Sequence, residues 1–207
     1  MTASNEFEKK LYSLGFKAIC GIDEAGRGPI AGPVVAAAVI LKPDFKAKGL
    51  NDSKTLSAKK RQKMLKIIND NALAVGICFV SPQEIDQINI LRATKKAMGC
   101  AIEQLKLKPD FILADFVDLT GLTKIPFESL VKGDSRSISI AAASIVAKET
   151  RDSYMSLIDK FYPEYGFKTH KGYPTKTHLK ALKKYGVTPI HRQTFKPVKQ
   201  VIEKTAI

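Results

Sequence analysis

The sequence predicts an α/β fold organised as one domain. Short apolar runs of β-prone residues alternate along the chain with segments whose apolar residues recur at helical spacing. The length of 207 residues suits one compact domain that buries roughly 70% of its unfolded surface. Neither a repeat, a low-complexity tract nor a long linker marks a boundary. The composition becomes basic and aromatic after about residue 160. We therefore expect a core at residues 1–160 and a basic, helical C-terminal region at residues 161–207, packed together as one domain.

The predicted strands are short apolar runs bounded by glycine, proline or polar residues. The first two, residues 16–23 (FKAICGID) and 33–41 (PVVAAAVIL), flank a glycine-rich loop. The later candidates are residues 72–80 (ALAVGICFV), 111–116 (FILADF) and 128–134 (ESLVKGD). Their alternation with helical segments predicts a single sheet covered by helices.

The predicted helices are placed by apolar spacing and by capping residues. Residues 57–70 carry their apolar side chains on one stripe, with Lys and Arg elsewhere. Ser81 opens a capping box (SPQE), and helical spacing continues through residues 91–107. Residues 139–162 predict a long helix whose first half is small and apolar enough to be buried. Thr175 is a typical N-cap for a helix in the basic, aromatic C-terminal region.

The composition favours a polyanionic partner. The formal net charge is +14, from 34 Lys and Arg against 20 Asp and Glu. Nucleic acid is one such partner, although a solvated lysine-rich surface gives the same count. No run approaches the roughly 20 apolar residues that span a bilayer, and the first residues lack the pattern of a signal peptide. We expect a cytoplasmic protein that does not contact a membrane.

The cysteines and histidines do not predict a metal knuckle or a disulfide framework. The cysteines are odd in number, far apart and flanked by apolar residues, which favours buried thiols: Cys20, Cys78 and Cys100. The histidines share the basic region and lack the HExxH pattern, which favours structural or backbone-contacting roles over a zinc site: His170, His178 and His191.

A glycine-rich loop at residues 26–32 (GRGPIAG) follows two adjacent carboxylates, Asp23 and Glu24. The glycine spacing and the β-prone segment that follows exclude a dinucleotide-binding loop, and residues 132–135 (KGDS) do not form a phosphate-binding Walker loop. Two carboxylates beside the loop would repel a phosphate unless cations lay between them. This arrangement therefore points to a divalent metal.

Two further acids occupy comparable positions. Asp115 ends a predicted strand as Asp23 does, and Asp134 precedes the long buried helix. Each acid alone is typical of a solvated turn, but together they form an oxygen-rich set that suits Mg²⁺. Because residues alternate between the faces of a strand, joint ligation by Asp23 and Glu24 requires the backbone to leave regular β geometry at Glu24.

Eight stretches, in order, resemble bacterial ribonuclease HII, the type 2 ribonuclease H, and they cover about residues 18 to 198: GIDEAGRGPIAGPVVAAAVIL, LNDSKTLS, EIDQINILRAT, ILAD, VKGDS, AAASIVAKETRD, YGFKTHKGYPTKTHL and HRQTFKPV. The resemblance implies a ribonuclease H-like fold, with a mixed five-stranded sheet flanked by helices and a helical C-terminal extension. It also implies cleavage of the RNA strand in RNA–DNA hybrids and incision 5′ of single ribonucleotides in duplex DNA, leaving 3′-hydroxyl and 5′-phosphate ends.

The resemblance assigns roles to individual residues. The residues implied to bind two Mg²⁺ or Mn²⁺ ions and to carry the catalytic step are four acids: Asp23, Glu24, Asp115 and Asp134. Recognition of the ribose 2′-hydroxyl falls to the main chain of Gly26, Arg27 and Gly28, and sensing of the following deoxyribose falls to Tyr173. Phosphate contacts are expected from Lys54, Lys148, Lys171 and Arg192. A sliding clamp is a possible partner of the tail at residues 198–207, and a monomer is the plain expectation.

The sequence departs from the family pattern beside the third acid. Many relatives have Asp-Gly where this chain has Asp115 followed by Phe116, and Asp118 adds a nearby carboxylate that competes for the assignment. The type 3 family is disfavoured because it carries a large N-terminal domain, whereas little more than a helix precedes the first strand here.

Two functions of other classes stay open. A non-catalytic nucleic-acid-binding module explains the charge and the aromatic residues but leaves the acids unexplained. An NAD-linked oxidoreductase lacks the loop-to-helix context that its cofactor needs. An assay of metal-dependent nuclease activity distinguishes a nuclease from the binding module. An assay of cofactor binding distinguishes a nuclease from the oxidoreductase.

Overall fold

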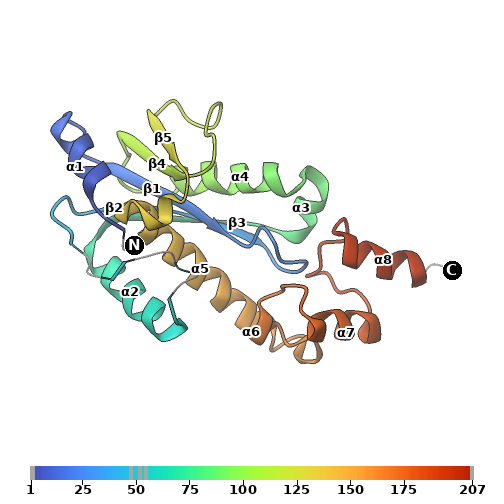
Figure 1. Ribbon diagram of the computed structural model, residues 1–207. Helices are drawn as coiled ribbons and strands as arrows, with labels where there is room; N and C mark the ends of the chain where they lie inside the picture. The colour runs from blue at the N-terminus through green and yellow to red at the C-terminus, as the bar shows by residue number, and fades with distance from the viewer. Residues whose placement is uncertain (1–2, 47–48, 51–52, 54–55, 206–207) are drawn as a thin grey trace.

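The computed structural model describes residues 3–46, 49–50, 53 and 56–205. Its centre is the predicted mixed sheet of five strands, in the order β3-β2-β1-β4-β5 (Figure 1). The strands are β1 (Ile19–Ala25), β2 (Val34–Leu41), β3 (Ala72–Val80), β4 (Phe111–Asp115) and β5 (Phe127–Leu130). The first three strands pair antiparallel, whereas β4 is parallel to β1 and to β5. The carboxyl ends of β1 and β4 therefore lie side by side.

Helices cover both faces of the sheet. They are α1 (Glu6–Ser13), α2 (Ala58–Asn71), α3 (Pro82–Ile88), α4 (Ile90–Glu103), α5 (Ile138–Ile158), α6 (Phe167–His170), α7 (Lys176–Tyr185) and α8 (Lys196–Thr205), with 3₁₀ turns η1 (Gly133–Ser135) and η2 (Pro163–Tyr165). Helix α4 lies on one face, and α5 with α2 beside it lies on the other (Figure 1). The predicted caps are confirmed: Ser81 accepts from the main-chain N–H of Glu84 and Thr175 from that of His178.

Successive side chains of β1 point to opposite faces of the sheet, and this decides which of them contact α4 and which contact α5. Cys20 and Ile22 are fully buried in the cluster that includes α4. Gly21 faces α5, where the space beside its Cα is taken by the main chain of Ser139. The start of α5 thus touches the backbone of the central strand, and this close approach fixes the helix relative to Asp23, two residues further along β1.

The fifth strand is shorter than the sequence predicts. Strand β5 ends at Leu130, so residues 131–134 of the predicted strand lie outside it. Lys132 has a φ of 54° and Gly133 follows it, which turns the chain into η1. Asp134 therefore sits in a 3₁₀ turn before α5 instead of at a strand end.

The prediction of three buried thiols is wrong for two cysteines. Cys78 on β3 and Cys100 on α4 form a disulfide, with their Cα atoms 5.8 Å apart. They are 22 residues apart in sequence, and they meet because α4 packs on β3. Cys20 is a free, buried thiol, and burial raises its pKa to about 12.

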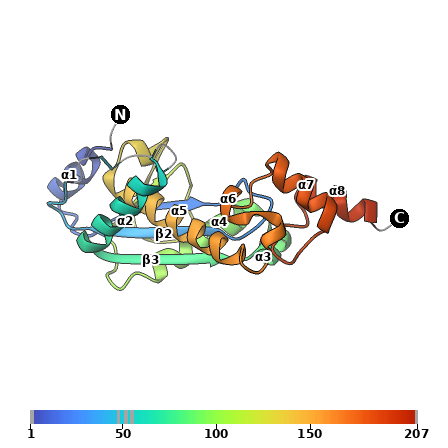
Figure 2. The ribbon, with the colours of Figure 1, turned by 90° about the horizontal axis from the view of Figure 1, so that it is seen from below.

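The C-terminal helices α6, α7 and α8 gather at the end of the molecule opposite α1 (Figure 2). They contact the core through an apolar cluster in which Ile30 packs with Leu182 and Val198. The division of the chain at residue 160 stays a prediction. Within the part of the chain that the structure describes, no helix is long and apolar enough to cross a membrane.

Candidate active site

Three carboxylates meet at the carboxyl ends of the parallel strands. Ile22 on β1 pairs with Ala114 on β4, so the next residues, Asp23 and Asp115, end side by side on the face that α5 covers. Asp134 reaches the same point from η1. One oxygen of each of these three carboxylates lies within 4.8 Å of the others. We call Asp23, Asp115 and Asp134 the acid group.

Hydrogen bonds and burial hold the acid group in place. Asp115 Oδ1 accepts from the main-chain N–H of Gly133 at 2.7 Å, which ties β4 to η1. Asp23 and Asp134 are buried. Burial and then the charges of Glu24 and Asp115 raise the pKa of the Asp23 carboxyl well above its usual range, although a hydrogen bond with Ser144 opposes this.

The acid group fits divalent cations. Close carboxylates repel one another in a site of reduced solvent access, and a cation between them offsets that repulsion. Carboxylate oxygens are also the ligands that Mg²⁺ and Mn²⁺ prefer. The donor set and its crowding therefore agree with the predicted metal site.

Glu24 is placed differently from the other acids. The ladder between β1 and β2 continues regularly past it, with Glu24 opposite Ala36 and Ala25 opposite Val35. The departure from β geometry that was taken as a condition for joint ligation is therefore absent, although Glu24 lines the same cleft as Asp115. Glu24 is outside the acid group, and its Oε1 accepts from Arg27 at 3.4 Å. Its assignment as a metal ligand stays a prediction.

Asp118, the competing carboxylate, lies apart from the acid group. Its side chain is exposed, with Oδ2 3.7 Å from the ammonium group of Lys95 and Oδ1 accepting from the main-chain N–H of Thr120 at 2.9 Å. Asp115 is thus the acid that the fold brings to Asp23 and Asp134.

A cleft of about 410 Å³ opens beside the acid group. It brings together the predicted loop at residues 26–28 with Glu24, Asp115, Lys148 and Tyr173. The Tyr173 ring lies over Gly28, where a β-carbon would come within 3.4 Å of Tyr173 Cε1. Sequence reasoning missed Phe116 and Arg151 as lining residues.

Arg192 holds the glycine-rich loop from inside. Its guanidinium donates to four main-chain oxygens, at 2.6 Å to Gly26, 3.1 Å to Arg27, 2.7 Å to Pro29 and 2.9 Å to Gly32. The side chain is 0% exposed, and burial lowers its pKa to about 9. The prediction that Arg192 contacts phosphate is therefore wrong: its donors are used by the loop.

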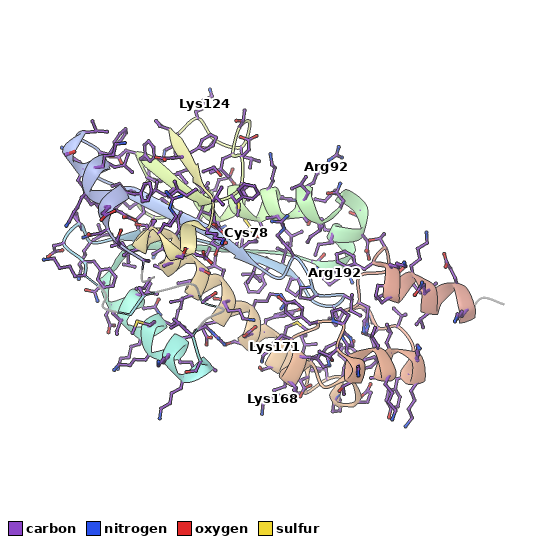
Figure 3. All side chains as sticks on the ribbon, viewed as in Figure 1. Cys78, Arg92, Lys124, Lys168, Lys171 and Arg192 are labelled. Atoms are coloured by element: carbon purple, nitrogen blue, oxygen red, sulfur yellow. A yellow bond between two sulfur atoms is a disulfide. The ribbon has the colours of Figure 1, made fainter. Side chains whose placement is uncertain are left out.

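Arg151 supports the same loop from α5. It donates to the main-chain oxygens of Pro33, Ala31 and Lys171 at 2.9–3.0 Å, and it is 1% exposed. Figure 3 labels Arg192 and Lys171 in this region, close to the loop and α6. The sequence signal for both arginines was indirect: a loop rich in Gly and Pro leaves carbonyls unpaired, and the five donors of Arg can satisfy several at once.

We expect Arg192→Met to lower the free energy of unfolding by about 3 kcal/mol, because four buried carbonyls lose their donor while the apolar stem is kept. Urea unfolding measures this. Arg92→Met, on the exposed face of α4, is the matched control and should change stability by less than about 0.5 kcal/mol. Equal midpoints for wild type and Arg192→Met would contradict the supporting role.

The lysines expected to contact phosphate differ in their surroundings. Lys148 lines the cleft, and its ammonium group donates to Asp152 at 2.8 Å. The ammonium group of Lys171 donates to Ser156 Oγ at 2.6 Å and to the main chain of Asp152 at 3.0 Å. Lys171 lines a neighbouring hollow with Arg61 and Glu149 and is not part of the cleft lining. Lys54 lies outside the described residues.

His178, which His191 orients, holds the main chain of Tyr173. The N–H of Thr188 donates to His191 Nδ1 at 3.1 Å, so the proton of His191 is on Nε2 and faces His178 Nε2 at 3.1 Å. The proton of His178 is then on Nδ1, which donates to the Tyr173 oxygen at 2.8 Å. Burial lowers the pKa of His178 and of His191 to about 4, so both rings are neutral at pH 7. The expected structural role is thus confirmed for these two residues.

Comparisons with known proteins agree with this geometry. The family model described as Ribonuclease HII matches residues 20–198. Ribonuclease HII from Acholeplasma laidlawii is 55% identical over 205 residues, which is 99% of this chain and 100% of the relative. A crystal structure of ribonuclease H2 from Pyrococcus horikoshii has a TM-score of 0.79 at 27% identity and covers 92% of this chain and 99% of its own. Ribonuclease HII from Archaeoglobus fulgidus, solved in a complex with PCNA, has a TM-score of 0.75 at 26% identity and covers 87% of this chain and 96% of its own.

Proposed function

This chain belongs to the ribonuclease HII family of metal-dependent hydrolases, which cleave RNA in RNA–DNA hybrids, and we propose that it also incises duplex DNA on the 5′ side of a single embedded ribonucleotide. The observation that carries the proposal is the meeting of two features in one cleft. Asp115 brings the acid group to the wall of this cleft, and the glycine loop and Tyr173 line the same cleft.

The acid group would hold two Mg²⁺ or Mn²⁺ ions, with Glu24 as a further ligand from the cleft. When bound, such ions activate the attacking water and stabilise the departing 3′ oxygen, which leaves 3′-hydroxyl and 5′-phosphate ends. The contribution of the protein is to keep Asp23, Asp115 and Asp134 in register, through the pairing of β1 with β4 and the hydrogen bond from Gly133 to Asp115.

Recognition of the ribonucleotide would come from the loop and from Tyr173. The buried arginines draw main-chain oxygens of the loop inward, which supports a fixed backbone at Gly26, Arg27 and Gly28 for contact with a ribose 2′-hydroxyl. Tyr173 packs over Gly28, so a sugar held by the loop lies next to its ring. Lys148 lines the cleft and would neutralise a phosphate, and the same role is proposed for Lys54 and Lys171 because they stand in motifs that resemble the family.

The proposal includes a sliding clamp as a partner. The relative from Archaeoglobus fulgidus was solved in a complex with PCNA. Helix α8 lies at the far end of the molecule from α1, close to the chain terminus (Figure 1). A tail in that position would reach a clamp without covering the cleft.

The testing experiment is incision of a labelled DNA duplex that carries one ribonucleotide, with Mg²⁺, Mn²⁺ or EDTA. We expect metal-dependent cutting on the 5′ side of the ribonucleotide, no cutting of an all-DNA duplex, and cutting of the RNA strand in a hybrid. Asp115→Asn should lose at least about 100-fold in rate, because a carboxylate of the metal site loses its charge.

Asp118→Asn is the matched control, since its carboxylate lies three residues away but outside the acid group. It should cut at the wild-type rate. Tight binding of the ribonucleotide duplex without cutting in any metal would instead favour the non-catalytic binding module. Equal losses in both variants would show that Asp115 has no special role.

A further inference from the structure

We propose that Phe116 is a substrate-binding residue whose ring packs on a sugar of the nucleic-acid strand beside the scissile phosphate. The inference rests on the proposed function, because it takes the acid group as the site of the reacting phosphate. It adds a contact on the side of the cleft that follows β4, away from the glycine loop.

Phe116 is placed in the cleft and turned toward solvent. Phe116 is 71% exposed to solvent, which is the highest value among the large hydrophobic residues that the structure describes. It lines the same cleft as Glu24, Gly28 and Tyr173. Single exposed apolar residues are common on protein surfaces, so exposure alone says nothing about function. The position beside the acid group is what makes this residue informative.

The backbone of Phe116 is strained. Its φ is 45°, in the left-handed region that L-residues with bulky side chains rarely adopt. The other non-glycine residues with positive φ in the described chain are Asn89, Lys132 and Lys171. Asn89 has a local reason, since its side chain caps α4 by accepting from the N–H of Arg92. Phe116 has no polar side chain with which to offset its strain in this way.

The strain is built into the geometry of the acid group. The N–H of Phe116 donates to the oxygen of Leu130 at 3.1 Å, which continues the pairing of β4 with the end of β5. One residue earlier, Asp115 accepts from the N–H of Gly133. The backbone at Phe116 is thus tied to the end of β5 by its own N–H and to η1 through Asp115. A glycine would satisfy this backbone without strain, whereas a Phe adds strain and an exposed ring.

The location of the ring selects the part of the substrate that it meets. Phe116 directly follows Asp115, so the ring lies within about one nucleotide of a phosphate held at the acid group. In a duplex the faces of the bases are covered by their neighbours, whereas the sugars line the minor groove and present C–H groups. An aromatic ring packs on such an apolar sugar face, and an aliphatic or missing side chain loses that contact.

The test compares wild type with Phe116→Gly and Phe116→Tyr on the duplex that carries one ribonucleotide. Phe116→Gly should raise KM about tenfold, with kcat/KM falling mainly through KM, because the ring contact is lost. It should also raise Tm by about 2 °C, because glycine relieves the strained φ. Phe116→Tyr keeps the ring and the strain, and should keep both KM and Tm near the wild-type values.

Phe161→Gly is the matched control. Phe161 is 70% exposed, lies outside the cleft lining, and is not among the residues with positive φ. It should leave KM unchanged and should not raise Tm. Binding of the same duplex is measured separately by fluorescence anisotropy in EDTA, where no turnover occurs.

The two measurements distinguish this inference from the proposed function. If wild type binds the duplex in EDTA but does not cut it with metal, the proposed function fails while the anisotropy still tests Phe116. If Phe116→Gly binds and turns over with the wild-type KM, the sugar contact is wrong. If Phe116→Gly instead melts below wild type, the strain argument is wrong, and if wild type binds no nucleic acid, both proposals fail together.

Discussion

Asp23→Asn should lower the rate of incision by at least about 1,000-fold while raising the stability of the metal-free protein. The rate falls because Asp23 is a member of the acid group, and a metal site that loses this charge loses several kcal/mol of transition-state stabilisation. The stability rises because a buried carboxylate that is repelled by its neighbours becomes a neutral amide.

The pH dependence of stability follows from the direction of the shift. In the metal-free protein the pKa of Asp23 is raised well above its usual range, so the folded state keeps a proton that the unfolded state has already lost. The free energy of unfolding therefore falls as the pH rises from the ordinary carboxyl pKa to the raised one. Asp23→Asn removes this fall, and bound Mg²⁺ or Mn²⁺ should oppose it.

Thermal unfolding in EDTA between about pH 4 and pH 8 measures the effect, beside single-turnover incision with metal. Asp44→Asn is the control, because Asp44 is exposed and lies outside the acid group. If Asp23→Asn cuts at the wild-type rate, Asp23 is not a ligand of the metal site. If metal-free Asp23→Asn melts below wild type, the argument from charge repulsion is wrong, while the catalytic role of Asp23 still stands.

The sheet and the acid group were predictable because both depend on local patterns that topology then combines. Asp23 and Asp115 each end an apolar run, and parallel neighbours carry such ends to the same edge of a sheet. Asp134 was predicted from its place just before the buried helix, and the structure keeps it there, in a 3₁₀ turn and not at the end of a strand. The period of two also explains why Glu24, one residue after Asp23, is outside the acid group.

The features that the sequence did not predict depend on long-range partners. Arg192 reads as one more cation of a basic tail, but it is buried because the loop at residues 26–32, far away in sequence, needs donors for its carbonyls. Cys78 and Cys100 show no paired spacing, and only the packing of α4 on β3 joins them. The left-handed φ of Phe116 likewise occurs where its N–H pairs with the oxygen of Leu130, a residue of another strand, and no local pattern reveals this.

Gly21→Ala should destabilise the protein by about 4 kcal/mol or more, which for a chain of this size lowers Tm by roughly 12 °C. A β-carbon at Gly21 would overlap the main-chain carbon and oxygen of Ser139 and the nitrogen of Ile140, and main-chain atoms at a helix start cannot turn aside as a side chain can. Either β1 or the start of α5 has to move. Both options disturb the acid group, because Asp23 follows on β1 and Asp134 precedes α5.

Gly99→Ala is the matched control, since Gly99 lies within α4 and a β-carbon there would meet nothing within 4 Å. It should raise the free energy of unfolding by up to about 1 kcal/mol, because Ala favours a helix interior more than Gly does. Urea unfolding separates the two variants, and calorimetric titration with Mn²⁺ on folded Gly21→Ala protein reports whether the acid group still binds a cation. A Gly21→Ala protein with wild-type stability would mean that the contact between β1 and α5 is looser than the structure shows. Wild-type Mn²⁺ affinity in a destabilised Gly21→Ala protein would mean that this contact stabilises the fold without positioning the acids.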